Sequence, residues 1–211
     1  MFNLALSQAE EVLYIGLSSA LSGTFQAGEV AAKEYKGKVR CFDSRSITAG
    51  QGILVEAALR LAESGLKAEE IQKILEKRRA ALELFVAIKD LRSLIRSGRL
   101  KGVKSIILRK FGLRPILGTD GAGKAKNRGV YMGRKNASAA LFALIKKMIK
   151  SGQVKSLQIV HVDARRGAEA LAVQCRAEAG DRLSIQVADM GPLLASIGWL
   201  GALGVAVLRR G

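Results

Sequence analysis

The chain alternates short apolar runs with longer segments in which apolar residues recur at helical spacing. A short apolar run that ends in a polar turn predicts a buried strand, and a 3.6-residue apolar period predicts a helix. We therefore expect strands over Glu11–Leu17, Lys38–Phe42, Leu84–Ile88, Leu113–Leu117, Leu157–Val162, Leu183–Val187 and Val205–Leu208. Helices are expected over Phe25–Tyr35 with Thr24 as its cap, Thr48–Glu63, Ala68–Ala81, Leu91–Ser97, Asn136–Lys150 and Gly167–Ala179, and Val103–Phe111 is a basic helix or an extended segment.

The order of these elements predicts an α/β fold with two lobes. Strand and helix alternate in the first part, which implies a mostly parallel sheet with flanking helices. Beyond Leu82 the order is mixed, and the turn Thr119–Gly123 has hairpin chemistry, which predicts an antiparallel pair. We expect a first α/β domain at residues 1–82 and a second, mixed α/β domain with a basic surface at residues 83–211.

The segment Met190–Leu208 carries no charged residue and is followed by Arg209 and Arg210. Its length alone is typical of a membrane-spanning helix with a positive flank. Pro192 and the glycines that recur along the segment favour a buried strand–loop–strand over a single spanning helix, and we expect that arrangement.

Composition indicates a folded chain with an aliphatic core, because 49% of the residues are hydrophobic and only 5% are aromatic. Cys41 and Cys175 are too few for a disulfide framework or a zinc cluster, which favours a reducing compartment. Met1–Leu13 lacks the basic and apolar regions of a secretory signal. We therefore expect a cytoplasmic protein.

The positive charge is concentrated in one part of the chain. The formal net charge is +17, and the window Lys89–Lys155 holds 18 basic residues against the two acids Asp90 and Asp120. Such a field attracts anions, which include phosphate, nucleic acid and the headgroups of anionic membranes. The simpler interpretation is that these charges lie on a solvated surface that binds no partner. Nucleic acid is the less favoured partner, because Phe111 and Tyr131 do not form the regular aromatic series that stacks on single strands.

The strongest candidate site is the junction Leu17–Thr24, where a strand ends, hydroxyls gather and a helix begins. Ser18, Ser19, Ser22 and Thr24 add hydroxyl donors to the free N–H groups of a helix start, which suits a carboxylate or a phosphate. Helix capping by Ser22 or Thr24 is the alternative that needs no ligand.

The second strand end, Asp43–Ser46 followed by Thr48–Gly52, has the same design. In a parallel sheet both junctions lie at the carboxyl edge, where ligands collect. Asp43 either orients a hydroxyl or caps the following helix, and we expect the cap.

Catalysis has little support in the residue pattern. The single histidine, His161, lies inside an expected strand and is predicted to be a core or rim side chain. The run Gly121–Lys124 lacks the spacing and the hydroxyl residue of a phosphate-binding loop. We therefore expect no enzyme, no cofactor and no metal site.

Several segments together resemble the DegV family of bacterial fatty-acid-binding proteins. The hydroxyl-rich run Leu17–Gln26 is similar to the family signature, and matches to further family elements follow in the same order over nearly the whole chain. They are Phe42–Ser46 with Gly50–Gly52, Asp90–Leu91 with Ser97–Arg99, Leu113–Leu117 with Asp120–Gly121, Gly191–Pro192, and Gly201–Ala206.

This resemblance implies a two-domain α/β protein that holds one long-chain fatty acid and has no catalytic activity of its own. The acyl tail would lie in an apolar tunnel with its carboxylate between the domains, and a separate fatty-acid kinase would phosphorylate the carboxylate. Carried over, Ser19 would bond the carboxylate, Arg99 would add positive charge nearby, and the residues that shape the pocket would be Ser18, Ser22, Gly23 and Thr24.

The chain also departs from the family pattern. It begins after the family's first strand and loop, which carry an Asp-Ser and a Thr-Ser-Gln-Pro-Ser motif, so we expect the first sheet to lack strands. The family's closing histidine falls on Ile197, and a family arginine falls on Met132. Two alternatives to a working lipid carrier therefore stay open: a phosphate- or nucleic-acid-binding protein that uses residues 89–155, and a degenerate family member.

Overall fold

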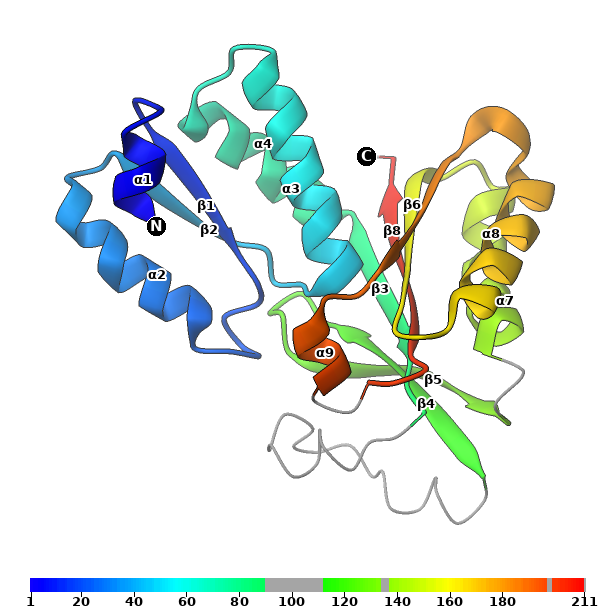
Figure 1. Cartoon of the computed structure of the whole chain (residues 1–211). Coiled ribbons are helices and arrows are strands. Elements are labelled where there is room, and N and C mark those ends of the chain that lie inside the picture. Colours follow the sequence, from blue (N-terminus) through cyan, green and yellow to red (C-terminus); the bar gives the residue numbers. More distant parts are fainter. Residues whose placement is uncertain (90–111, 134–136, 197–198, 211) are drawn as a thin grey trace.

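The computed structural model describes residues 1–89, 112–133, 137–196 and 199–210, and these form two sheets with covering helices (Figure 1). The small sheet pairs β1 (Val12–Gly16) and β2 (Val39–Asp43) in parallel, as expected for the first part of the chain. The helix α2 (Thr24–Ala32), extended by a 3-10 turn over Lys33–Tyr35, connects them. A short helix α1 (Phe2–Leu6) lies against this sheet, where Phe2 forms edge-on ring contacts with Tyr14 and Tyr35.

The large sheet contains six strands in the order β5-β4-β3-β8-β6-β7. All neighbours are antiparallel except β6 and β7. The strands are β3 (Leu82–Ala87), β4 (Leu113–Thr119), β5 (Ala125–Met132), β6 (Val154–His161), β7 (Ser184–Asp189) and β8 (Leu203–Arg209). The last strand, β8, lies between β3 and β6, and all of its residues except Arg209 are buried. This central position explains why the end of the chain is so apolar.

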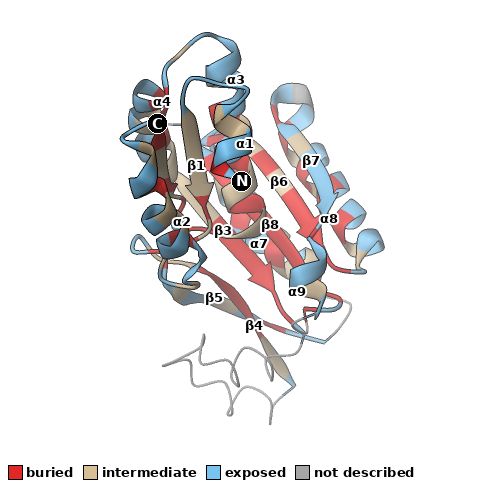
Figure 2. Ribbon diagram, turned by 60° about the vertical axis from the view of Figure 1, so that its left-hand side comes forward, coloured by how far each residue is buried: buried red, intermediate tan, exposed pale blue. Residues whose placement is uncertain are grey.

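Alternating side chains of the large sheet face two different cores. On one face, residues such as Phe85 and Val205 pack against α7 (Ala137–Lys150) and α8 (Arg165–Ala179). On the other face, Leu84, Val86 and Ala206 turn towards the small-sheet side of the molecule. Figure 2 shows the resulting buried band along β3, β8 and β6, whereas β7 is largely exposed.

The helix α3 (Thr48–Glu63) belongs to the cores of both sheets. Its first turns place Ala49 and Ile53 on the large sheet. On a different face of the same helix, Leu54 and Ala57 pack with Phe42 of the small sheet in a second core, which also takes in α4 (Ala68–Ala80). The spacing of these residues places two apolar faces on one helix, so α3 connects the two sheets.

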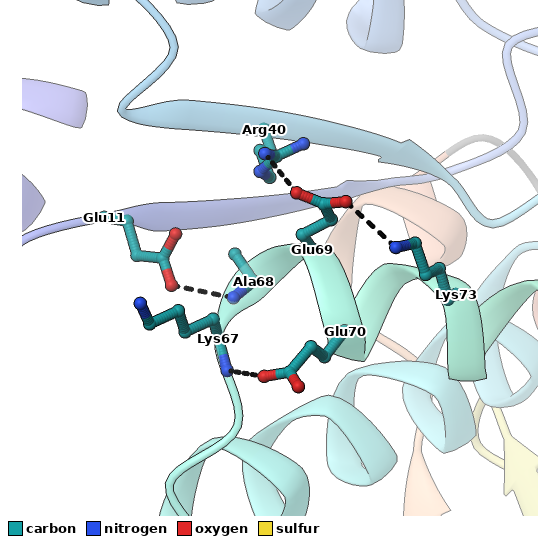
Figure 3. A network of polar contacts seen from close by, with 7 residues as sticks. All are labelled: Glu11, Arg40, Lys67, Ala68, Glu69, Glu70 and Lys73. Atoms are coloured by element: carbon teal, nitrogen blue, oxygen red, sulfur yellow. Dashed lines mark hydrogen bonds and ion pairs between the residues drawn. The ribbon is translucent and has the colours of Figure 1, made fainter.

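The start of α4 is fixed by acidic side chains (Figure 3). The Glu70 carboxylate accepts a hydrogen bond from the backbone N–H of Lys67 at 3.0 Å, and Glu11 accepts one from the N–H of Ala68 at 2.7 Å. Glu69 forms ion pairs with Arg40 and Lys73, and the hydrogen bond and charge of Lys73, followed by the charge of Arg40, lower the pKa of Glu69. Acids early and bases late along this helix agree with the sequence expectation.

The structure confirms the α/β class and most expected elements, with shifts of a few residues at their ends. Two expectations about these elements are wrong. Thr24 is the first residue of α2 and gives no side-chain cap, because Gly23 holds the cap position. The expected strand–loop–strand over Met190–Leu208 contains a helix, α9 (Pro192–Ser196), before β8. The helices α1 and α9 were not expected from the pattern, whereas β5 is the second strand of the antiparallel hairpin that the Thr119–Gly123 turn predicts.

Two expected segments, Leu91–Ser97 and Val103–Phe111, lie outside the described residues, as does much of the basic window. In the described part of the chain, no helix has the length and apolar character needed to cross a membrane.

Candidate functional site

The two hydroxyl-rich junctions lie side by side at the carboxyl edge of the small sheet. The parallel register places Gly16 at the end of β1 opposite Asp43 at the end of β2. Beyond these residues, the N–H of Ser44 donates to the Gly16 carbonyl at 3.1 Å, and the N–H of Ser18 donates to the Ser46 carbonyl at 2.8 Å. The ends of β1 and β2 therefore lie side by side, as expected.

Ser18 connects the small sheet to the β4–β5 hairpin. Its side chain is fully buried, and its hydroxyl donates to the carbonyl of Gly123 at 2.7 Å. Gly123 has φ +79°, and a Cβ atom at this position would meet the Ser18 Oγ. A glycine is required here for both reasons, because L residues rarely adopt this conformation and the two turns approach closely.

Ser19 is bound to Asp43 across the small sheet. Its hydroxyl donates to Oδ2 of Asp43 at 2.6 Å, and its N–H lies 3.2 Å from Oδ1. Oδ1 also accepts the N–H of Arg45 at 2.8 Å. The expectation that Asp43 caps the next helix is wrong, since the cap position of α3 is Ile47 and no side chain caps it. Asp43 instead orients the Ser19 hydroxyl and joins the two turns.

Arg79 of α4 fixes Asp43 from the other side. Its Nη1 donates to the backbone carbonyl of Asp43 at 2.6 Å, and its guanidinium lies 4.7 Å from the centre of the Phe42 ring. Burial, followed by the positive charge of Arg45, lowers the pKa of Arg79. The guanidinium is therefore a structural group that holds the end of β2 in place.

A cavity of about 290 Å³ opens between these turns and the large sheet. One wall is the large sheet itself, through Leu84, Val86 and Leu117. The opposite walls come from the turn after β1 and from α9, and they are also apolar: Leu17, Leu21, Leu193 and Leu194. The cavity is thus bounded by aliphatic side chains from both halves of the chain.

A small number of polar groups also line this cavity. Ser22 and Thr24 are among them, and their hydroxyls bond to each other at 2.8 Å. Thr48 and Gln51 contribute from the first turn of α3, and Trp199 contributes from the segment after α9. Gln51 Nε2 donates to the carbonyl of Ile15 at 3.1 Å.

The predicted site residues therefore fall into three groups. Ser22 and Thr24 line the cavity, and Gly23 lies between them. Ser18 and Ser19 direct their hydroxyls to Gly123 and Asp43 instead. Arg99 lies outside the described residues, as does Ile197.

The sequence pattern did not indicate that Trp199 and Thr48 line the same cavity. Both residues belong to segments far from the Ser-rich junction along the chain. Thr48 belongs to the second hydroxyl-rich junction, which the sequence analysis identified. No sequence signal near Trp199 indicates that it lines the cavity.

Among the residues that the structure describes, those around the cavity form no arrangement typical of catalysis. His161 is buried in β6, as expected, with Nδ1 3.2 Å from Oδ1 of Asp189, and it is not among the residues that line the cavity. Within the described ranges, no group of three or more histidine, cysteine or acidic residues is arranged to hold a metal ion.

Comparisons with known proteins agree with this architecture. A family model described as "Uncharacterised protein, DegV family" matches residues 1–210. A DegV domain-containing protein of Mycobacterium tuberculosis is 32% identical over 204 residues, a match that covers 97% of this chain and 72% of the relative.

Solved structures of similar fold include a DegV family protein from Thermus thermophilus, described by its fatty acid binding. It has a TM-score of 0.84 and 25% identity, and the match covers 99% of this chain and 74% of that one. The Fatty Acid Kinase (Fak) B3 protein of Streptococcus pneumoniae, loaded with linoleic acid, has a TM-score of 0.86 at 17% identity, with 99% and 75% of the two chains covered. At 17% identity, the similarity to the Streptococcus pneumoniae protein supports a shared fold alone.

Proposed function

Because this chain belongs to the DegV family, we propose that it binds one long-chain fatty acid in the cavity between its two sheets. The acyl tail lies against the aliphatic walls, and the carboxylate lies at the junction between β1 and α2. The Thermus thermophilus relative, described by its fatty acid binding, supports the choice of ligand.

The observation that carries this proposal is the composition of the cavity walls. Small-molecule sites are mostly apolar, with volumes of about 300 to 1,000 Å³ and a few polar groups that orient the ligand. The cavity described above is about 290 Å³ and has aliphatic walls with polar groups from Ser22, Thr24, Thr48, Gln51 and Trp199. Each methylene buried there contributes about 0.8 kcal/mol.

The predicted site residues take two kinds of role in this proposal. Ser22 and Thr24 face the ligand, and Gly23 holds the cap position of α2 between them. Ser18 and Ser19 hold the turn in shape through their bonds to Gly123 and Asp43.

Arg99 remains our proposed source of positive charge near the carboxylate.

We further propose that the protein presents its ligand to a fatty-acid kinase and catalyses no reaction itself. The Streptococcus pneumoniae protein, whose name includes the fatty acid kinase, shares this fold and carries linoleic acid. The division at residue 82, a cytoplasmic location and contact of the basic window with anionic membranes are further parts of this proposal.

Mass spectrometry of organic extracts from the purified protein tests the proposal. Native protein should yield fatty acid in near-stoichiometric amount. Ala125→Phe, which adds bulk at the wall of the cavity, should reduce that amount. Ala170→Phe on the exposed face of α8 is the matched control and should retain it. Folded protein that yields no fatty acid, and that takes up none when supplied, would refute the proposal.

A further inference from the structure

A second cavity, of about 440 Å³, adjoins the aliphatic one and has the opposite chemistry. Its walls come from the turn after β2, from the C-terminal part of α4, from the start of β3 and from the turn of the β4–β5 hairpin. Thr119 lines both cavities. More than half of the residues around the second cavity are charged: Arg45, Arg79, Arg128, Arg209, Glu76, Glu83 and Asp120.

Two of these arginines share a single acid. Oε2 of Glu83 lies 3.7 Å from Nη1 of Arg128, and its Oε1 lies 3.4 Å from Nη1 of Arg209. Asp120 is engaged within its own turn, where Oδ1 accepts two backbone N–H groups. The acids that form these contacts therefore leave the other two arginines of the wall without a carboxylate.

Arg45 and Arg79 have no ion-pair partner in the described part of the chain. The guanidinium of Arg45 donates to the carbonyl of Gly121 at 3.1 Å, and that of Arg79 donates through Nη1 to the carbonyl of Asp43. Neither carbonyl carries a charge that would neutralise its donor. Arg45 is exposed, and Nε and Nη2 of Arg79 are absent from the buried, unpaired polar atoms, so both side chains keep donors that a ligand can reach.

The two guanidinium groups also repel each other. Burial, followed by the positive charge of Arg45, lowers the pKa of Arg79, although the charges of Asp43 and Glu76 act in the opposite direction. A partly buried positive charge without a partner is unfavourable, and a nearby like charge adds to this cost. An anion that contacts both groups would relieve the repulsion and the loss of solvation together.

We propose that this cavity binds the phosphate group of a small organic phosphate between Arg45 and Arg79. Phosphate suits the pair because it carries a charge of about −1.5 to −2 at pH 7, and its oxygens accept paired hydrogen bonds from guanidinium groups. The volume lies within the range of about 300 to 1,000 Å³ that holds whole small molecules. Glu76 and Asp120 repel a second phosphate and accept hydrogen bonds from hydroxyl groups. The ligand class is therefore a sugar or nucleoside monophosphate, and its binding does not depend on the fatty acid.

Calorimetric titration of the whole chain at fixed ionic strength tests the inference. Ribose 5-phosphate and AMP should bind, inorganic phosphate should bind more weakly, and ribose and adenosine should not bind. Arg45→Gln removes one charge and should weaken both monophosphates at least about 10-fold, whereas Arg45→Lys keeps the charge and should lose less. Glu76→Gln removes a negative charge from the wall and should strengthen both about two- to fivefold.

Arg166→Gln is the matched control. It removes the same charge from an exposed side chain of α8, which contributes no residue to the cavity, and should leave the affinities unchanged. Equal losses in Arg45→Gln and Arg166→Gln would show attraction by the net charge alone and would overturn the inference. Weaker binding in Glu76→Gln would overturn it as well. Native protein that binds a single-stranded oligonucleotide but neither monophosphate would also refute it.

A second measurement uses the native protein and does not depend on the folding of a variant. Phenylglyoxal modifies accessible arginines, and mass spectrometry of peptides reports the extent at each position. AMP should protect Arg45 and Arg79 from modification, and adenosine should protect neither. Arg166 should react equally in all samples. Protection of all three arginines, or of none, would overturn the inference.

Discussion

Shortening the ligand provides a direct measure of how much acyl chain the cavity holds. An apolar cavity of about 150 Å³ accommodates one six-carbon ring, so the 290 Å³ between the two sheets corresponds to about 12 carbons by the same proportion. Each buried methylene contributes about 0.8 kcal/mol, which is about a fourfold gain in affinity. Saturated fatty acids should therefore bind about fourfold more tightly per added carbon up to about 12 carbons, and the gain should fall sharply beyond that length.

The assay is calorimetric titration or probe displacement with even-numbered acids from eight to 18 carbons, below their aggregation concentrations. The chain length at which the gain in affinity falls gives the capacity of the cavity. The gain per carbon below that length shows how well the cavity excludes water. A slope that continued undiminished to the longest acid would show that the cavity between Leu84, Leu117 and Leu194 does not define the binding site. Affinity independent of chain length would refute the burial argument altogether.

Four substitutions within the chain have calculable effects on stability. Asp43→Ala removes the acceptor of three hydrogen bonds and should lower the free energy of unfolding by about 2–3 kcal/mol, whereas Ser19→Ala should cost only about 1 kcal/mol. Gly123→Ala places a side chain on a residue with φ +79° and against the Ser18 hydroxyl, and should cost about 2 kcal/mol or more in urea unfolding. Burial raises the pKa of Cys175 from 9.0 to about 12. The unfolded chain therefore ionises this thiol first, so stability should fall as pH rises above about 9, and Cys175→Ala should remove that part of the slope.

Each of these predictions has a contrary result. Equal losses in Asp43→Ala and Ser19→Ala would mean that the carboxylate does not join the two turns. A neutral effect of Gly123→Ala would contradict the close approach of the hairpin to Ser18. A pH dependence that is the same in native protein and Cys175→Ala would show that the thiol does not stay protonated in the folded state.

The local pattern predicted most of the helices and strands because their signals lie within a few residues. Thr48–Glu63 carries its apolar period within its own length and is followed directly by the Ser64–Gly65 stop, and its bounds agree with those of α3. The sequence does contain one signal for α9. Pro192 is the first residue of that helix, a position that proline favours. The charge-free composition of the segment hid this signal, because it equally suits a buried strand.

The features of the fold and the site that the sequence did not predict depend on contacts between distant parts of the chain. Nothing near Leu203–Arg209 indicates that this strand enters the middle of the large sheet. The partner of Ser19 lies 24 residues away, and the partner of Ser18 lies 105 residues away. The sequence therefore predicted the hydroxyl cluster, but the direction of each hydroxyl depends on tertiary packing.

The shared helix α3 has a consequence for how the molecule unfolds. Ile53 and Leu54 are neighbours in the chain, yet one packs in the core of the large sheet and the other in the core of the small sheet. Melting either half strips an apolar face from the same helix, so neither half retains its packing after the other is lost. We expect the aromatic signals of Tyr14 on the small sheet and Trp199 by the large sheet to disappear in a single transition, with equal midpoints in heat and in denaturant.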